Sequence, residues 1–326
     1  MLRRIVFIVL ALVLAPPALA DGLAQLDFGI ISTDSSSAIR SRYEPMFHDL
    51  EAALGMPVKL YLAGDYAGMI QAMRFGKVQI ARFGNKSAAE AVDRSDGEVA
   101  FRAVDHDGMM GYHSVLIVHR DSPLQSVDDV LREAPTLAFG AGDPNSTSGT
   151  LVPGYYVFAK HGVDPKKLFK RIAIANHETN ALVVANRQVD VATNNDIALE
   201  RLARAAPEKR ALIRVIWTSP LIPNDPFVWR KDLPDDLKQK IAAFFLAYGV
   251  EGPPDRLAHE RAVLDGLKWQ RIIRSSNAQL VPTRQIELFT ERLKLAEDES
   301  LAGDEKARRL AEIDAKLKAL EAMAGS

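Results

Sequence analysis

The sequence predicts an α/β fold of two lobes that enclose a ligand cleft. Short runs of β-branched and apolar residues alternate with longer helical patterns over residues 26–84, and the same rhythm returns over residues 136–194. Strands that alternate with helices usually form parallel sheets covered by helices. The length of 326 residues favours two packed units over a single core. Because ligands of such sheets bind beyond the carboxyl ends of the strands, we expect the site between the lobes.

The first lobe opens with alternating strands and helices. We expect strands at 26–32, 58–64, 78–84 and 114–120, and helices at 43–55 and 66–76. Apolar residues recur at helical spacing in "YEPMFHDLEAALG", and Gly55 ends that helix. The run "SVLIVHR" is typical of a buried strand, and "DSPLQSVDDVLRE" after it is typical of a capped helix.

The second lobe repeats this series. We expect strands at 136–140, 171–175, 189–194 and 214–219, helices at 148–161 and 178–188, and a further strand at 225–230. The chain is expected to cross between the lobes near residues 112–122 and again near 215–228. The first lobe then comprises residues 21–118 and 222–285, and the second comprises residues 119–221.

The first 20 residues have the three parts of a secretory signal peptide. A basic pair at 3–4 precedes the apolar run 5–15, and "ALA" at 18–20 supplies a small-x-small cleavage site. The apolar run is too short to cross about 30 Å of hydrocarbon, and two prolines stand where a span would continue. The sequence has no cysteine, so we expect neither a lipid anchor after the cleavage site nor a disulfide.

The composition narrows the function classes. Hydrophobic residues make up 48% and charged residues 25%, as in ordinary globular proteins. A formal net charge of −1 gives no sign of a nucleic acid or an anionic membrane as a partner. The motifs GxSxG and HExxH are absent, so we expect a binding protein without a cofactor, not an enzyme.

The charged C-terminal tail, residues 286–326, is predicted to be helical. Leu310, Ile313, Leu317 and Leu320 recur at spacings of three and four. Two interpretations remain open at this point. The amphipathic tail packs on its own protein, or its helices join two copies in a homodimer.

The loop "GDPNSTSG" carries three consecutive hydroxyl side chains, Ser146, Thr147 and Ser148. It lies between a predicted strand and a predicted helix, and the first N–H groups of a helix have no internal partner. Hydroxyls beside such N–H groups form a pocket for a tetrahedral oxyanion. A plain helix cap is the alternative, although one serine suffices for that. The phosphate-loop motif GxxxxGK[ST] is absent.

Several long segments resemble one family. "GDPNSTSG" with "LVPGYYVFAK", "HETNALVVANRQVDVATNN" and "SPLIPNDPFVWR" look like the periplasmic phosphonate-binding proteins of ABC transporters, as do "DYAGMIQAMRFGKVQIARFGNKSAAEAVDR" and "GYHSVLIVHRDSP". The resemblance runs from about Phe28 to Leu280. It implies a two-lobed periplasmic-binding-protein fold that closes on a phosphonate and delivers it to a membrane permease. It also implies that the exported protein works in the periplasm.

The resemblance places the site residue by residue. The implied ligand-binding residues are Tyr66, Tyr112, Ser146, Thr147, Ser148, His177 and Asp225. The hydroxyls of the loop would hold the phosphonate oxygens, the two tyrosines would donate hydrogen bonds, and His177 would add a donor. Asp225 would face an ammonium group of the ligand. The alternatives are core tyrosines, a structural histidine, and a turn role for the aspartate before Pro226.

One departure from the family concerns the organic substituent. Members that bind 2-aminoethylphosphonate use a second carboxylate shortly after "DVATNN", where this sequence has Asp196, Ile197 and Ala198. If Ile197 is the counterpart, Asp196 is the candidate substitute ligand. We therefore expect phosphonate binding, with a 2-aminoethylphosphonate-like ligand if Asp196 serves as the second carboxylate. Arg82 lies beside the expected cleft, and the sequence does not fix its direction.

Two other functions remain open, whereas metal binding and catalysis are disfavoured. The same fold could bind phosphite, phosphate or a sulfonate, or it could act as a ligand-sensing component. The segment "DHDGMMGYH" at 105–113 gathers two histidines and two aspartates, but its spacing matches no metal-ligand pattern. Ser148 could pair with His177 as nucleophile and base, yet reversible binding gains nothing from that chemistry. We expect no metal and no catalytic residue.

Overall fold

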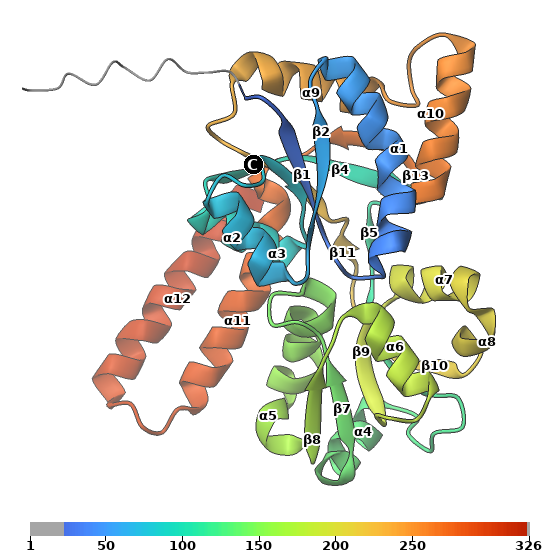
Figure 1. The fold of residues 1–326 in the computed structure, drawn as a ribbon. Helices are drawn as coiled ribbons and strands as arrows, with labels where there is room; N and C mark the ends of the chain where they lie inside the picture. The colour runs from blue at the N-terminus through green and yellow to red at the C-terminus, as the bar shows by residue number, and fades with distance from the viewer. Residues whose placement is uncertain (1–22, 325–326) are drawn as a thin grey trace, which may run out of the picture.

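Two lobes, each built on its own β-sheet, are stacked with a cleft between them in the computed structural model (Figure 1). The structure describes residues 23–324. The predicted signal peptide, residues 1–20, lies outside the described residues. No helix in the described part of the chain is long and apolar enough to span a membrane.

The first lobe contains a six-stranded sheet in the order β13-β4-β12-β3-β1-β2. Its strands are β1 (Leu26–Ile31), β2 (Val58–Ala63), β3 (Ile80–Arg82), β4 (Gly97–Asp105), β12 (Pro226–Arg230) and β13 (Trp269–Arg274). Its helices are α1 (Ser36–Leu54), α2 (Tyr66–Arg74), α3 (Asn85–Arg94), α9 (Asp235–Ala247) and α10 (Pro254–Leu267). β1 is parallel to β2 and β3, as the alternating pattern predicts. In contrast, β12 is antiparallel to β3 and β4, and β13 is antiparallel to β4.

The second lobe contains a five-stranded sheet in the order β10-β6-β9-β7-β8. Its strands are β6 (Ser114–His119), β7 (Ala138–Ala141), β8 (Arg171–Ile174), β9 (Val191–Asn195) and β10 (Ile213–Thr218). Its helices are α4 (Val127–Glu133), α5 (Pro165–Leu168), α6 (His177–Ala185), α7 (Asp196–Ala205) and α8 (Pro207–Arg210), with a 3₁₀ turn at Ala134–Thr136. β7 is parallel to β8 and β9, so its carboxyl end and that of β9 meet at one edge.

Two chain crossings join the lobes. Gly111–Tyr112 (β5) pairs antiparallel with Ile222–Pro223 (β11), and together they form a two-stranded connection. β6 belongs to the second sheet, so the first crossing lies near residue 113 and the boundary expected at residue 118 falls inside a strand. All six residues of β6 are buried, and an apolar strand carries no sequence signal of the sheet to which it belongs.

The helix predicted for residues 148–161 is irregular. The segment consists of π-helical turns at Thr147–Leu151 (η2) and Gly154–Phe158 (η3), followed by a 3₁₀ turn at Ala159–His161 (η4). Pro153 has no N–H to donate, so it interrupts the regular hydrogen-bond ladder between the two π turns. Such irregular turns are frequent at functional sites.

The C-terminal tail folds back on its own chain. After the 3₁₀ turn Asn277–Leu280 (η5), helices α11 (Val281–Glu297) and α12 (Gly303–Ala324) form an antiparallel pair (Figure 1). Leu295, Ile313 and Leu317 are buried between them. α11 also contacts α3 in the first lobe and η2 to η4 in the second. The amphipathic pattern is thus used in packing within the chain, and a homodimer stays a prediction.

Candidate ligand-binding site

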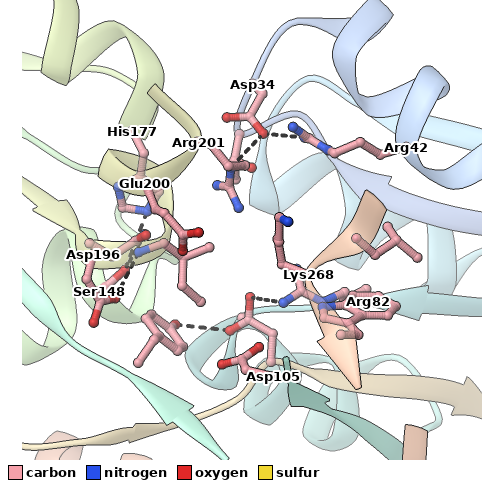
Figure 2. A pocket seen from close by; sticks show the side chains of 18 of the residues that line it. Asp34, Arg42, Arg82, Asp105, Ser148, His177, Asp196, Glu200, Arg201 and Lys268 are labelled. Carbon is pink, nitrogen blue, oxygen red and sulfur yellow. Dashed lines mark hydrogen bonds and ion pairs between the residues drawn. The ribbon is translucent and has the colours of Figure 1, made fainter. Parts of the chain in front are cut away.

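A cavity of about 340 Å³ lies between the two lobes. Every residue that the sequence assigned to the site lines it: Tyr66, Tyr112, Ser146, Thr147, Ser148, His177, Asp196 and Asp225. The first lobe contributes the two tyrosines from the start of α2 and from β5, and the second contributes the hydroxyl loop after β7. Figure 2 shows charged side chains from both lobes directed into the same space.

The hydroxyl loop is held in place by close backbone packing. Ser146 caps η2 by accepting a hydrogen bond from the N–H of Gly149 at 3.0 Å, and Gly142 N donates to Gly149 O at 3.1 Å. A Cβ atom on Gly142 would lie 2.5 Å from the Cα of Gly149, so only glycine permits this approach. Thr193 Oγ1 in β9 also donates to Gly149 O at 2.8 Å. The loop is therefore preorganised before any ligand arrives.

The three hydroxyl side chains of the loop are each 2% exposed. Ser148 Oγ accepts from Asn195 Nδ2 at 3.3 Å and lies 3.4 Å from His177 Nε2. Thr147 Oγ1 accepts the backbone N–H of Lys86 at 2.9 Å, which joins the loop to the amino end of α3 in the other lobe. The oxyanion pocket and a contact between the lobes thus share one short segment.

His177, at the start of α6, is buried and neutral. Its pKa is lowered to about 4, mainly by burial and then by the positive charge of Arg201, while the negative charge of Asp34 opposes both effects. Its Nδ1 has no hydrogen-bond partner among the described residues. A neutral imidazole offers one N–H donor to an oxyanion. His177 therefore contributes no positive charge to the site at neutral pH in the ligand-free protein.

This burial predicts a pH dependence of folding. The pKa of His177 is about 4 in the folded protein and about 6.5 in the unfolded chain. Between these values the unfolded chain binds more protons, so stability falls as the pH falls, by about 3 kcal/mol in all. Urea unfolding of the ligand-free protein from pH 7 to 4 should show this loss, and His177→Gln should remove it.

An exposed histidine of the same lobe supplies the control. His161→Gln should retain the wild-type loss of stability, since His161 is exposed. Parallel profiles for the wild type and His177→Gln would contradict the account of His177.

Tyr66 and Tyr112 line the cavity with their phenol groups protonated. Burial raises the pKa of both tyrosines, and nearby Asp225 raises each pKa further. Tyr66 shares a hydrogen bond with Ser146. Tyr112 OH donates to Asp225 Oδ1 at 3.0 Å. Both phenols can donate to an oxyanion, but Tyr112 must first release the carboxylate.

Asp225 is not a free carboxylate in this structure. Arg82 Nη2 lies 3.3 Å from its Oδ2, while Tyr112 occupies Oδ1. Burial raises the pKa of Asp225, and Arg82 and Tyr112 partly offset that effect. Arg82, whose direction the sequence left open, points into the cleft from the end of β3 and stacks 5.6 Å from the ring centroid of Trp269. An ammonium group would have to compete with this guanidinium.

Asp196 lines the cavity, but its carboxylate is bound to the protein. Its oxygens accept from the backbone N–H of His113 at 3.0 Å and from Ile197 N at 2.9 Å, and Oδ2 lies 3.0 Å from His113 Nδ1. These contacts favour a structural role at the amino end of α7. Ile197 faces the cavity beside it and packs near Tyr112.

We expect Asp196→Ala to distinguish a structural role of Asp196 from a role in ligand binding. Loss of its hydrogen bonds with His113 and Ile197 N should reduce the free energy of unfolding by about 1 kcal/mol. The affinity for 2-aminoethylphosphonate should change less than about threefold, because the Asp196 carboxylate is already bound by His113 and by the backbone N–H of Ile197. Calorimetry checks this, and a loss of tenfold or more would restore Asp196 as a ligand residue.

A cluster of charged residues at the cavity was missed from the sequence. Asp34, in the loop after β1, pairs with Arg42 of α1 and lies 3.1 Å from Arg201 Nε of α7 (Figure 2). Burial alone would raise the pKa of Asp34, but Arg201 and Arg42 hold it below the usual range. A signal was present, since Ile197, Glu200, Arg201 and Arg204 share one face of α7 at spacings of three and four.

The chain matches known proteins along most of its length. The family described as "ABC transporter, phosphonate, periplasmic substrate-binding protein" matches residues 28–280. The phosphonates-binding periplasmic protein of Escherichia coli (strain K12) is 48% identical over 312 residues, which is 96% of this chain and 90% of that protein.

Solved structures of other binding proteins are also similar to this chain. A binding protein component of an ABC phosphonate transporter from Pseudomonas aeruginosa superposes with a TM-score of 0.87 at 50% identity, covering 91% of this chain and 96% of that one. A protein from Prochlorococcus marinus (MIT 9301), solved in complex with methylphosphonate, superposes with a TM-score of 0.70 at 20% identity, covering 81% and 97%. The second match concerns the fold alone.

Proposed function

Because the chain belongs to the family of periplasmic substrate-binding proteins of phosphonate ABC transporters, we propose that it captures organophosphonates in the cleft and delivers them to an ABC permease. The observation that carries the proposal is the buried hydroxyl loop Ser146–Ser148 beside neutral His177 and two protonated tyrosines. These groups offer several hydrogen-bond donors and no negative charge at the position of an oxyanion. The relatives are substrate-binding proteins and not enzymes, as the sequence predicts.

Capture requires the lobes to open and close about the β5–β11 connection. In the proposed mechanism the phosphonate oxygens bind first to the loop in the second lobe, and the tyrosines reach them from the first lobe on closure. Two contacts join the lobes beside the cavity in this arrangement. Lys86 N–H binds Thr147, and Asp34 pairs with Arg201. A ligand drives closure only through contacts that are better in the closed state.

The organic substituent is the open part of the proposal. The aminoethyl ligand expected from the sequence would bring its ammonium group to Asp225, in competition with Arg82. We therefore propose organophosphonates as the class, and 2-aminoethylphosphonate is one candidate among them.

Growth and uptake test the transport role. Cells that lack this protein should fail to take up a labelled phosphonate, and they should fail to grow with that phosphonate as the sole phosphorus source. The wild-type protein should restore both properties, and the Ser146→Ala/Ser148→Ala variant should restore neither. Normal uptake without the protein would contradict delivery to a permease and would favour the alternative of a ligand-sensing component.

A further inference from the structure

Arg82 and Arg201 are two partly buried arginines that line the same cavity from opposite lobes. Their side chains are 21% and 24% exposed. The Nε–H of each lacks a well-aligned hydrogen-bond acceptor among residues 23–324. Buried guanidinium donors normally have acceptors, because leaving them unsatisfied is unfavourable. The cavity is therefore lined by cationic groups for which a ligand could supply further hydrogen-bond acceptors.

The carboxylates around these arginines already form ion pairs and hydrogen bonds within the protein. Asp225 is shared by Arg82 and Tyr112, and one carboxylate, Asp34, serves both Arg42 and Arg201. The group of Asp34, Arg42 and Arg201 thus carries one excess positive charge. Ile197 adds no charge beside it.

The remaining acids of the cavity do not cancel this excess at Arg201. Glu200 is about half exposed and pairs with Arg204 at 2.6 Å, so solvent and its partner screen it. Asp196 binds His113. Asp105 is the last residue of β4, where burial raises its pKa, and Asp107 lies in the turn that follows. In the described chain, Asp34 is the one carboxylate that forms an ion pair with Arg201.

Figure 2 shows how the side chains of Arg201 and Lys268 are oriented in the cavity. The end of the Arg201 guanidinium is directed into the open centre of the cavity, and the side chain of Lys268 extends into the same space from the first lobe. Lys268 lies 3.6 Å from Asp265 on its own helix end. An anionic group here would meet Arg201 from one lobe and Lys268 from the other.

We propose that this part of the cavity binds a carboxylate at the end of the ligand's organic substituent, so that the preferred ligands are phosphonocarboxylates and not aminoalkylphosphonates. The inference rests on the proposed phosphonate function, with the phosphonate group held by Ser146–Ser148. Arg201 is then the residue that determines specificity by binding the carboxylate. Arg82 acts by neutralising Asp225, which removes the site of an ammonium group.

Calorimetric titration with matched pairs of ligands tests the inference. The probes are phosphonoacetate, 3-phosphonopropionate and 4-phosphonobutyrate, each compared with the alkylphosphonate of the same length that ends in a methyl group. We expect at least one phosphonocarboxylate to bind the wild-type protein about tenfold or more tightly than its methyl-ended partner, since a charge-assisted hydrogen bond is added. 2-Aminoethylphosphonate should bind more weakly than that phosphonocarboxylate.

Variants of Arg201 separate the carboxylate site from the phosphonate site. Arg201→Gln should remove the advantage of the phosphonocarboxylate over its methyl-ended partner, and any loss common to both ligands measures the closure contact between Arg201 and Asp34. Arg201→Lys should restore part of the advantage. Arg132→Gln, an exposed arginine of the same lobe that pairs with Asp129, should change neither affinity. Retained binding of the methyl-ended ligand also shows that the variant is folded.

The outcomes distinguish this inference from the proposed function. Equal binding of each matched pair, or tightest binding of 2-aminoethylphosphonate, would overturn the carboxylate site and leave phosphonate binding intact. An equal loss for both ligands in Arg201→Gln would also overturn it, because Arg201 would then act on closure alone. Absence of binding by every phosphonate would overturn both proposals.

Discussion

Replacing Ser146 and Ser148 together by alanine is expected to weaken the binding of methylphosphonate by at least a hundredfold. Each hydroxyl removed from a buried oxyanion site eliminates a charge-assisted hydrogen bond of about 1.5–3 kcal/mol, which is about ten- to hundredfold in affinity. Both side chains are 2% exposed, so bulk water cannot take their place. Calorimetric titration of the wild type and the variant measures the difference.

The same substitution should have a smaller effect on folding. Ser146 caps η2, and the loss of a helix cap reduces the free energy of unfolding by about 1 kcal/mol. Ser122→Ala is the matched control, because Ser122 accepts a hydrogen bond from Leu124 N in the same lobe but does not line the cavity. Affinity for the double variant within tenfold of the wild type would show that the phosphonate is held elsewhere.

Arg82→Met is expected to have the largest effect on stability and to change the ligand preference. It leaves Asp225 buried without its charged partner, and breaking a buried ion pair from one side reduces stability by about 3–5 kcal/mol. The released carboxylate becomes available to an ammonium group. The affinity for 2-aminoethylphosphonate relative to ethylphosphonate should therefore rise about tenfold or more. Urea unfolding and calorimetry measure the two effects.

The pH dependence identifies the cause of the lost stability. Burial raises the pKa of Asp225 in the folded protein, so the unpaired charge destabilises at neutral pH. This effect should decline as the pH falls through the raised folded value to about 4, where the carboxyl group is protonated in both states. Arg82→Met/Asp225→Leu, which removes both charges, should recover most of the stability. A single variant as stable as the wild type, or an unchanged preference, would contradict the role of this pair.

Much of the fold could be predicted from the residue pattern. The strands at 26–32 and 58–64 form as β1 and β2, and the helix ending at Gly55 does end there, with φ 65° at that glycine. That helix begins at Ser36 and not at Tyr43. Its first turns carry mostly exposed serines and arginines, so they lack the apolar spacing that marks a helix. The two-lobed fold is confirmed by the similar structures.

The remaining errors come from interactions that are distant in sequence. β6 joins the second sheet because it pairs with β9 and β10, about 80 and 100 residues later. The strand β13, "WQRIIR", was not predicted, since only Trp269 and Ile272 are buried in it and its pairing with β4 decides its conformation.

The candidate site likewise contains residues that the sequence predicted and residues that it did not. The family resemblance placed the hydroxyl loop, the tyrosines and His177 at the positions that now line the cavity. The direction of Arg82 depends on Asp225, 143 residues away, and the cluster at Asp34 joins three separate segments. Local patterns contain no information about such pairs, and in our proposal these pairs determine which organic substituent is preferred.

The most direct test of the central claim is calorimetric titration of the mature protein with 2-aminoethylphosphonate, methylphosphonate, phosphite and phosphate. The account predicts saturable one-to-one binding of at least one of the two phosphonates, and the loss of that binding in the Ser146→Ala/Ser148→Ala variant. Binding of phosphate or phosphite alone would mean that the same loop serves another oxyanion. Absence of heat from all four would contradict a phosphonate site in this cleft.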